Sequence, residues 1–162
     1  MPTTFELRAA QDSDLPSIAQ LFYDTIRNVN LSDYTPRQVA AWAPEVWTAQ
    51  SWRERLAGQD VRVAVERDLV VGFVSIERSG HLDFLFVHKD HQRRGIGSAL
   101  VGTVLEQARA WGLDRVFTES SITARGLFER FGFVVQKGED IVRQGVTLHR
   151  YRMQCELTGP PK

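Results

Sequence analysis

A short basic loop, punctuated by glycine, joins an apolar strand to an apolar-striped helix within residues 86–100. At such a junction the first backbone N–H groups of the helix have no intrahelical partner and lie at the positive end of its dipole, so together they can bind one anion. Gly95 and Gly97 lack a Cβ and let an anion approach the main chain, while Arg93 and Arg94 add positive charge. The stretch therefore predicts a binding site for a pyrophosphate.

Two common nucleotide-binding loops do not fit this stretch. It has neither the Gly-Lys-Ser/Thr ending of a P-loop nor the three glycines of a dinucleotide-binding fingerprint. Residues 92–97 instead fit the pattern Gln/Arg-x-x-Gly-x-Gly/Ala. This pattern resembles the coenzyme A signature of the GNAT superfamily of N-acetyltransferases.

A second motif follows in the order that the superfamily has. After a strand-like segment, residues 121–133 resemble the element Asn-x-x-Ala-x-x-x-Tyr-x-x-x-Gly-Phe. Residues 34–42, taken together with residues 121–124, resemble the YafP-like branch of the superfamily. The resemblance then covers nearly the whole chain.

Hydrophobic periodicity predicts an α/β (mixed α+β) fold in a single domain over residues 1–157, with a disordered tail over residues 158–162. The predicted strands are residues 5–9, 61–65, 69–76, 81–87, 115–119, 133–137 and 141–153, and the predicted helices begin near residues 12, 35, 48, 95 and 124. This order is that of the GNAT acyl-CoA N-acyltransferase fold. The resemblance implies a mixed central sheet, splayed at the cofactor site, with helices on both faces.

Composition restricts the function classes. Twenty basic residues balance twenty acidic ones, which argues against a nucleic-acid or membrane-surface binder. The chain has no apolar run of membrane-spanning length and no secretory signal pattern, so we expect a cytoplasmic protein. A single cysteine, Cys155, excludes an intramolecular disulfide, and four scattered histidines predict no metal site.

The resemblance implies acetyl-CoA as cosubstrate, bound where two neighbouring strands part. Main-chain groups near Leu85, Phe86 and Val87 would pair with the pantetheine arm, because buried backbone groups need partners. The implied pyrophosphate site consists of Gln92, Arg93, Arg94, Gly95, Ile96, Gly97 and Ser98. Ser121 and Phe128 would lie beside the cofactor, although a phenylalanine at such a position more often belongs to the helix core.

Two carboxylates are candidates for catalysis. An ammonium cannot attack a thioester, so a base must first accept its proton. Asp83 interrupts an apolar strand in the segment where related acetyltransferases carry an acidic group, but strand alternation equally allows it to face solvent. Glu119 ends the next strand and is the second candidate, or else a surface acid; Glu77 is a weaker third.

The chain departs from the family pattern on the acid side. Phe128 stands where the motif has the tyrosine that protonates the leaving thiolate, and Ser121 stands where it has asparagine. A thiolate leaves tolerably well without protonation, so the loss slows the reaction rather than preventing it. Tyr34, Tyr151 and Cys155 are alternative acids. The same departures favour a second hypothesis, a non-catalytic acyl-CoA-binding module of the same fold.

Aromatic residues concentrate in the first third of the chain. Tyr23, Tyr34, Trp42, Trp47 and Trp52 would suit the wall of an acceptor pocket, the core or a homodimer surface. The predicted activity is acetyl transfer from acetyl-CoA to a primary amine by direct attack. The acceptor would be a small molecule or a peptide amine, which the sequence does not distinguish.

Overall fold

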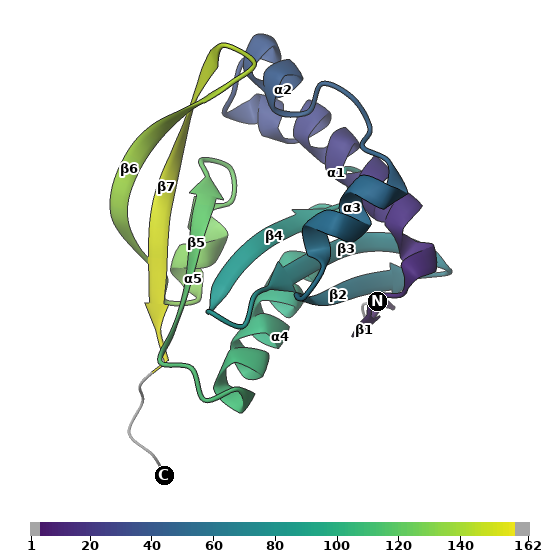
Figure 1. The fold of residues 1–162 in the computed structure, drawn as a ribbon, viewed down its shortest axis with the longest axis vertical. Helices are drawn as coiled ribbons and strands as arrows, with labels where there is room; N and C mark the ends of the chain where they lie inside the picture. The colour runs from purple at the N-terminus through teal and green to yellow at the C-terminus, as the bar shows by residue number, and fades with distance from the viewer. Residues whose placement is uncertain (1–3, 158–162) are drawn as a thin grey trace.

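A seven-stranded mixed sheet organises the chain, and the computed structural model describes residues 4–157 (Figure 1). The strand order is β1-β2-β3-β4-β5-β7-β6, in which only β4 and β5 run parallel. The strands are β1 (Glu6–Ala9), β2 (Asp60–Glu66), β3 (Leu69–Ile76), β4 (His81–Val87), β5 (Arg115–Ser121), β6 (Val134–Arg143) and β7 (Val146–Glu156). The predicted α/β fold is confirmed. The predicted tail, residues 158–162, lies outside the described residues, and the single-domain boundary at residue 157 stays a prediction.

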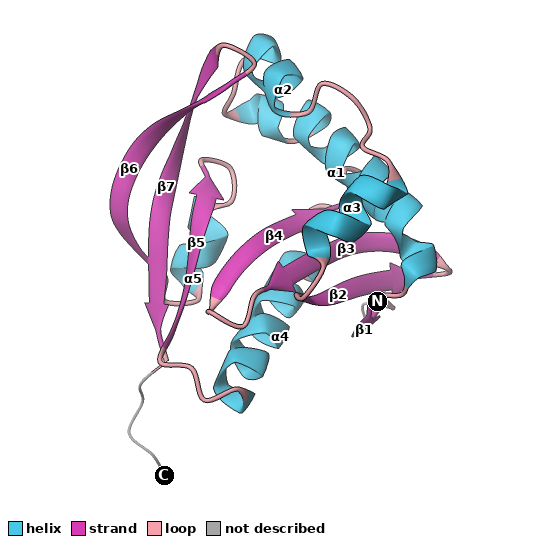
Figure 2. Ribbon diagram, viewed as in Figure 1, coloured by secondary structure: helices cyan, strands magenta, loops and turns pink. Residues whose placement is uncertain are grey.

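Helices cover both faces of the sheet (Figure 2). They are α1 (Leu15–Asn28), α2 (Pro36–Trp42), α3 (Ala49–Leu56), α4 (Ile96–Ala110) and α5 (Arg125–Arg130), with short 3₁₀ turns η1 (Asp12–Asp14) and η2 (Asn30–Ser32). One apolar cluster packs α1, α2 and α3 on one face, and a second packs α4 and α5 on the other. None of the described helices is both long and apolar enough to cross a membrane.

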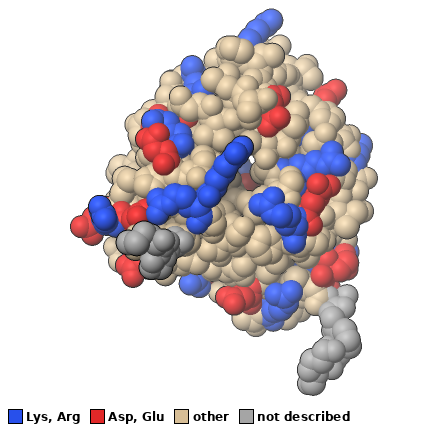
Figure 3. All heavy atoms as spheres, turned by 180° about the vertical axis from the view of Figure 1, so that it is seen from behind, with Lys and Arg blue, Asp and Glu red and all other residues tan. Residues whose placement is uncertain are grey.

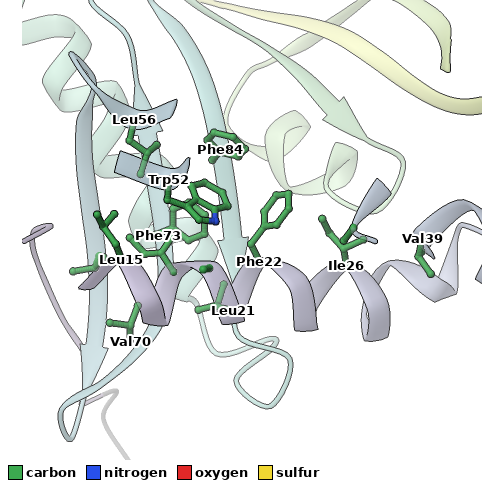
Figure 4. Close-up of a cluster of buried hydrophobic side chains, with 14 of the residues drawn as sticks. Leu15, Leu21, Phe22, Ile26, Val39, Trp52, Leu56, Val70, Phe73 and Phe84 are labelled. Atoms are coloured by element: carbon green, nitrogen blue, oxygen red, sulfur yellow. The ribbon is translucent and has the colours of Figure 1, made fainter. Parts of the chain in front are cut away.

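Trp52 anchors α3 to the sheet. Its side chain is fully buried, and its ring lies 5.0 Å from the rings of both Phe22 on α1 and Phe84 on β4 (Figure 4). Edge-on aromatic contacts of this kind add to the free energy gained from apolar burial. Because Arg55 follows one turn later on α3, this packing also sets where its guanidinium meets β4.

The two halves of the sheet part between β4 and β5. These strands pair only at His81 with Phe117 and at Leu82 with Thr118. Beyond that point β5 stays paired with β7, and Figure 1 shows β5, β7 and β6 diverging from β4. The splayed sheet that the resemblance implied is therefore present.

Local sequence signals explain where α2 begins and where two of the strands lie. Thr35 caps α2: its hydroxyl accepts from the Gln38 N–H at 3.1 Å, and the Gln38 side chain accepts from the Thr35 N–H at 2.9 Å. Pro36 takes the first helical position, where its missing N–H costs nothing. The predicted bounds 69–76 and 81–87 agree with β3 and β4.

The last two strands were predicted with the wrong boundary. Residues 138–140 were expected to form the connection, but they continue β6, and the hairpin turns at Gln144 and Gly145. Both turn residues have positive φ, 52° at Gln144 and 73° at Gly145, as a two-residue type I′ hairpin turn requires. Gly138 lies within the strand, close to a register shift after Val135. In the sequence, Gly138 inside a strand cannot be distinguished from a glycine of a turn.

Candidate active site

A cavity of about 440 Å³ lies at the point where β4 and β5 part; we call it the splay cleft. Its walls come from β4 and β5, from the helices α1, α2, α3 and α5, and from the β6–β7 hairpin. The ionisable side chains in the walls are Tyr34, Arg55, Asp83, Glu119, Arg143, His149 and Arg150. The cleft therefore combines apolar walls with charged groups of both signs.

A second cavity of about 100 Å³ continues the splay cleft toward the carboxyl end of β4. The two cavities share Leu85, Phe86, Ser121 and Ala124 as lining residues. The second cavity also touches Gln92, which lies in the loop of residues 88–95, here called the cradle loop. The two adjoining cavities therefore form one groove that runs from the splay cleft to the cradle loop.

The backbone of β4 directs alternate residues into the groove. The His88 N–H donates to the Val71 carbonyl on β3, and the Phe86 carbonyl also faces β3, beside Gly72. Because main-chain direction alternates along a strand, Leu85 and Val87 face the gap instead. The resemblance implied that main-chain groups of Phe86 face the cofactor, but they face β3, and Phe86 lines the groove with its side chain.

The Val87 carbonyl already has two partners within the protein. It accepts from the Thr25 hydroxyl at 2.9 Å and from the Gln92 side chain at 2.7 Å. Gln92, predicted to bind pyrophosphate, thus ties the cradle loop to β4 with its side chain. Leu85, by contrast, has no partner strand on the β5 side in the described sheet, since β4 and β5 pair only at His81 and Leu82.

The cradle loop ends in a left-handed turn at Gly95, which caps α4 with φ 84°. A Cβ at Gly95 would meet nothing within 4 Å, so the main chain there is open to a ligand. Ile96 is buried in the core, and only its N–H can contribute, together with those of Gly97 and Ser98 in the same turn. A Cβ at Gly97 would lie 2.9 Å from the Leu127 side chain, so this glycine also permits α5 to pack on α4.

The two arginines of the cradle loop, Arg93 and Arg94, differ in how available their charges are to a ligand. Arg94 forms an ion pair with Glu66 at 2.8 Å and donates a hydrogen bond to the second carboxylate oxygen at 3.0 Å. Together with a hydrogen bond from Thr4, this contact lowers the pKa of Glu66 to about 2. Arg94 therefore fixes the loop to β2 and has part of its charge neutralised. Arg93 is exposed, with φ 62°. Of the two, Arg93 is the better placed to meet an anion.

Asp83 neither faces solvent nor stands free. Its side chain is only 5% exposed and lies 2.8 Å from the Arg55 guanidinium. The Gln59 amide donates a further hydrogen bond to it at 2.9 Å, and Arg55 also lies over the Phe84 ring. The carboxylate that strand alternation could have exposed is thus covered by α3 and the segment after it.

Glu119 lines the splay cleft and contacts a histidine that the sequence did not single out. Oε1 of Glu119 lies 2.7 Å from Nε2 of His81, and Nδ1 of His81 lies 3.2 Å from Oε1 of Glu77. The hydrogen bond with Glu119 raises the pKa of His81 and, reciprocally, lowers the pKa of Glu119. No signal in the sequence pointed to His81, because its contact with Glu119 depends on the register in which β4 and β5 pair, with His81 opposite Phe117.

The residues considered for the acid role are placed differently. Phe128 is buried against Phe133 and lines the cleft. Tyr34 lines the cleft too, but its hydroxyl donates to the His149 carbonyl at 2.6 Å and accepts from the Ile122 N–H at 2.9 Å. Burial raises the pKa of Tyr34. The phenol thus holds the segment before α2 against the end of the β5–β7 ladder, and we call this contact the clamp.

Ser121 and Cys155 have local structural partners. The Ser121 hydroxyl accepts from the Ala124 N–H at 3.0 Å, which stabilises the turn before α5. Cys155 is buried beside the Phe131 carbonyl, and burial raises the pKa of its thiol. Tyr151 packs under the Arg125 guanidinium, 4.6 Å from it.

Only part of the predicted aromatic wall lines the cleft. Tyr34, Trp42 and Trp47 do so, whereas Trp52 is core and Tyr23 packs against Arg27. Residues 4–157 contain no group of three or more metal-ligating side chains close enough to hold an ion. On the face seen in Figure 3, Lys and Arg side chains are interspersed with Asp and Glu rather than gathered into one basic surface.

Comparison with known proteins agrees with this geometry. A family model described as an acetyltransferase (GNAT) domain matches residues 30–155. The protein named uncharacterized N-acetyltransferase YafP, from Escherichia coli K12, is 31% identical over 150 residues, which cover 92% of this chain and 94% of that protein. Human N-acetyltransferase 8 is 29% identical over 115 residues, covering 69% of this chain and 48% of its own length.

Solved structures share the fold. A GCN5-related N-acetyltransferase from Rhodopseudomonas palustris superposes with a TM-score of 0.90 at 27% identity, covering 97% of this chain and 98% of that one. YncA of Salmonella typhimurium, solved with acetyl-CoA, gives a TM-score of 0.74 at 21% identity over 96% of this chain and 95% of its own. PaiA N-acetyltransferase of Thermoplasma acidophilum, solved with coenzyme A, gives a TM-score of 0.74 at 13% identity, covering 95% of this chain and 99% of that one.

Proposed function

This chain belongs to the GNAT family of acetyltransferases, and from that premise we propose that it transfers the acetyl group of acetyl-CoA to a primary amine by direct attack. The observation that carries the proposal is the continuous groove from the cradle loop to the splay cleft. One end of the groove suits a pyrophosphate and the other holds carboxylates beside apolar walls. An acyl donor and an amine can therefore meet inside one groove.

Acetyl-CoA fits the groups that the groove presents. The N–H groups of the first turn of α4, with the open main chain at Gly95, would hold the pyrophosphate. Leu85 would pair with the pantetheine amides, because its main chain faces the gap left by β5. The Val87 N–H can add a further donor, whereas its carbonyl is held by Thr25 and Gln92.

The amine must lose a proton before it attacks the thioester carbon. Glu119 and Asp83 both line the cleft and are the candidate acceptors. Asp83 is held by Arg55 and Gln59, so a substrate would have to compete with that ion pair for it. Within residues 4–157, the one hydrogen-bond partner of the Glu119 side chain is His81, which can itself carry a proton. These contacts favour Glu119 as the acceptor.

The thiolate of coenzyme A leaves next to Phe128 in this proposal. Phenylalanine supplies no proton, but the thiol has a pKa of about 8.5, so its anion is an adequate leaving group near neutral pH. Cys155 is buried in β7 with a raised pKa, which supports direct attack over an acyl-cysteine intermediate. A cytoplasmic location and a homodimer stay predictions.

The competing hypothesis is an acyl-CoA-binding module without activity, favoured by Phe128 and Ser121 in the acid-side motif. A screen of amino acids, polyamines and short peptides, monitored by thiol release from acetyl-CoA, separates the two. We expect release that depends on an amine and exceeds hydrolysis without acceptor. Acetyl-CoA binding with no release for any amine would favour the module.

A further inference from the structure

We propose that His81 and Glu119 act as one proton-accepting unit: Glu119 takes the proton of the attacking ammonium in the cleft and passes it to Nε2 of His81. Glu77 holds the other ring nitrogen. This inference rests on the proposed acetyl transfer and names a positioning residue, His81, that does not itself line the cleft.

The geometry forms an unbroken chain from cleft to surface. Glu119 lines the splay cleft and lies 2.7 Å from His81, which lies 3.2 Å from Glu77. The side chain of Glu77 is 44% exposed, whereas that of His81 is 18% exposed. The imidazole also stacks on Phe117, with the ring planes 18° apart, so its orientation is fixed from a third side.

The position in the sheet explains why these groups meet. His81 and Phe117 are opposite each other in the last stretch where β4 and β5 pair, and Glu119 lies two residues further along β5, where the strands begin to part. Residues two apart on a strand share a face, so Phe117 and Glu119 both contact the imidazole. The unit thus lies at the base of the splay.

The proton transfer balances as follows. The ammonium N–H bond breaks and an O–H bond forms at Glu119, which frees the nitrogen electron pair to attack the thioester carbon. The proton then moves to Nε2 of a neutral His81, which becomes an imidazolium between two carboxylates. After the product leaves, the unit returns this proton to water through Glu119, and the accepting form is restored.

Surrounding charges set the pH at which the unit accepts a proton. Glu119, Asp83 and Glu77 all favour the imidazolium, and they raise the pKa of His81 above its ordinary value against the effect of burial. Arg150 and Arg152 on β7 favour the ionised Glu119. Since the two groups share one proton, they titrate as a pair. The accepting form becomes available as the pH rises through the raised pKa of His81.

The test is the pH dependence of kcat/KM for the wild type, His81→Gln and Glu119→Gln. Glutamine can still donate to Glu119 but cannot accept a proton. In the wild type, kcat/KM should rise with pH through an apparent pKa above the ordinary histidine value of about 6.5. His81→Gln should lower kcat by about tenfold at pH 8. It should also lower the apparent pKa through which kcat/KM rises by at least about one pH unit, because the lone carboxylate is a weaker base. Glu119→Gln should lower kcat by about a hundredfold.

Two further measurements separate the role of His81 from folding. Each variant should keep its acetyl-CoA affinity. Glu77→Gln changes the solvent-exposed end of the chain of contacts, so it should lower the apparent pKa of the kcat/KM profile in the same direction as His81→Gln but by less. The NMR titration of the His81 ring in the resting protein should give a raised pKa that falls in Glu119→Gln. An active His81→Gln enzyme with the wild-type pH profile would overturn this inference and leave the proposed function intact. A His81 ring with a measured pKa at or below the ordinary histidine value would do the same. Failure of the wild type to turn over any amine would overturn the proposed function and the inference together.

Discussion

The hydroxyl of Tyr34 donates a 2.6 Å hydrogen bond to the main-chain carbonyl of His149, 115 residues away in the sequence. The same oxygen accepts from the Ile122 N–H, so one side chain from the segment before α2 contacts both β7 and the loop after β5. Ile122 follows, and His149 precedes, the last pair of the β5–β7 ladder, Ser121 with Arg150, and both Tyr34 and His149 line the splay cleft. The clamp therefore ties the segment before α2 to the end of the β5–β7 ladder, beside the splay cleft.

Tyr34→Phe should lower the free energy of unfolding by about 1–3 kcal/mol, because a partly buried carbonyl and a partly buried N–H would lose their partner. Tyr23→Phe is the matched control on α1 and should stay within about 0.5 kcal/mol of the wild type. Chemical denaturation of both variants measures the difference. Equal losses would mean that the hydroxyl of Tyr34 contributes nothing as a clamp.

Gly95→Asp should weaken acetyl-CoA binding by about tenfold or more, because a carboxylate would lie at the positive end of α4 where the pyrophosphate is expected. Gly95→Asn is the control of equal size without charge. Both side chains tolerate the left-handed conformation and favour a helix N-cap, so the two variants should unfold at similar temperatures. Calorimetric titration with acetyl-CoA decides; similar affinities in both variants would show that the cradle loop does not hold the phosphates.

Phe128→Tyr should keep or raise kcat, since it would restore a hydroxyl at the position that the family motif uses to protonate the thiolate. Phe133→Tyr is the control, because Phe133 is equally buried, packs on Phe128 and does not line the cleft. It should lose stability without gaining rate. A marked fall of kcat in Phe128→Tyr, with acetyl-CoA affinity intact, would contradict a position beside the leaving group.

The ion pair between Glu66 and Arg94 should stabilise the fold in a pH-dependent way. Arg94 and Thr4 lower the pKa of Glu66 from 4.5 to about 2. A lowered pKa contributes stability that is fully present above pH 4.5 and is lost as the pH falls toward 2. Glu66→Gln should therefore melt below the wild type at pH 7, and the gap should narrow between pH 4.5 and 2. A gap that is constant over this range would assign the effect to packing instead.

Local signals in the sequence predicted most of the fold. Alternation and turn residues delimited β3 and β4, and Thr35 with Pro36 marked the start of α2. The β6–β7 turn was missed because Gly138 lies inside a strand while Gln144, an ordinary residue, adopts positive φ. Local propensity does not decide between two such sites when strand pairing determines the outcome.

The candidate site was predicted less completely, for a different reason. The cradle loop is contiguous and could be identified by its spacing. The pairs that set the chemistry, Asp83 with Arg55 and Glu119 with His81, are 28 and 38 residues apart. Which partner each carboxylate finds depends on how α3 packs and on where β4 meets β5. That information arises only when the sheet is assembled.

The fate of the acetyl group tests the account most directly. In one reaction with acetyl-CoA and the best acceptor from the amine screen, mass spectrometry would follow the amine and the intact protein while free coenzyme A is quantified. We predict one acetylated amine for each coenzyme A released and no acetyl group on the protein, Cys155 included. Acetyl-CoA that binds but is never consumed, coenzyme A released without acetylated amine, or an acetylated protein intermediate would contradict direct transfer to an amine in the splay cleft.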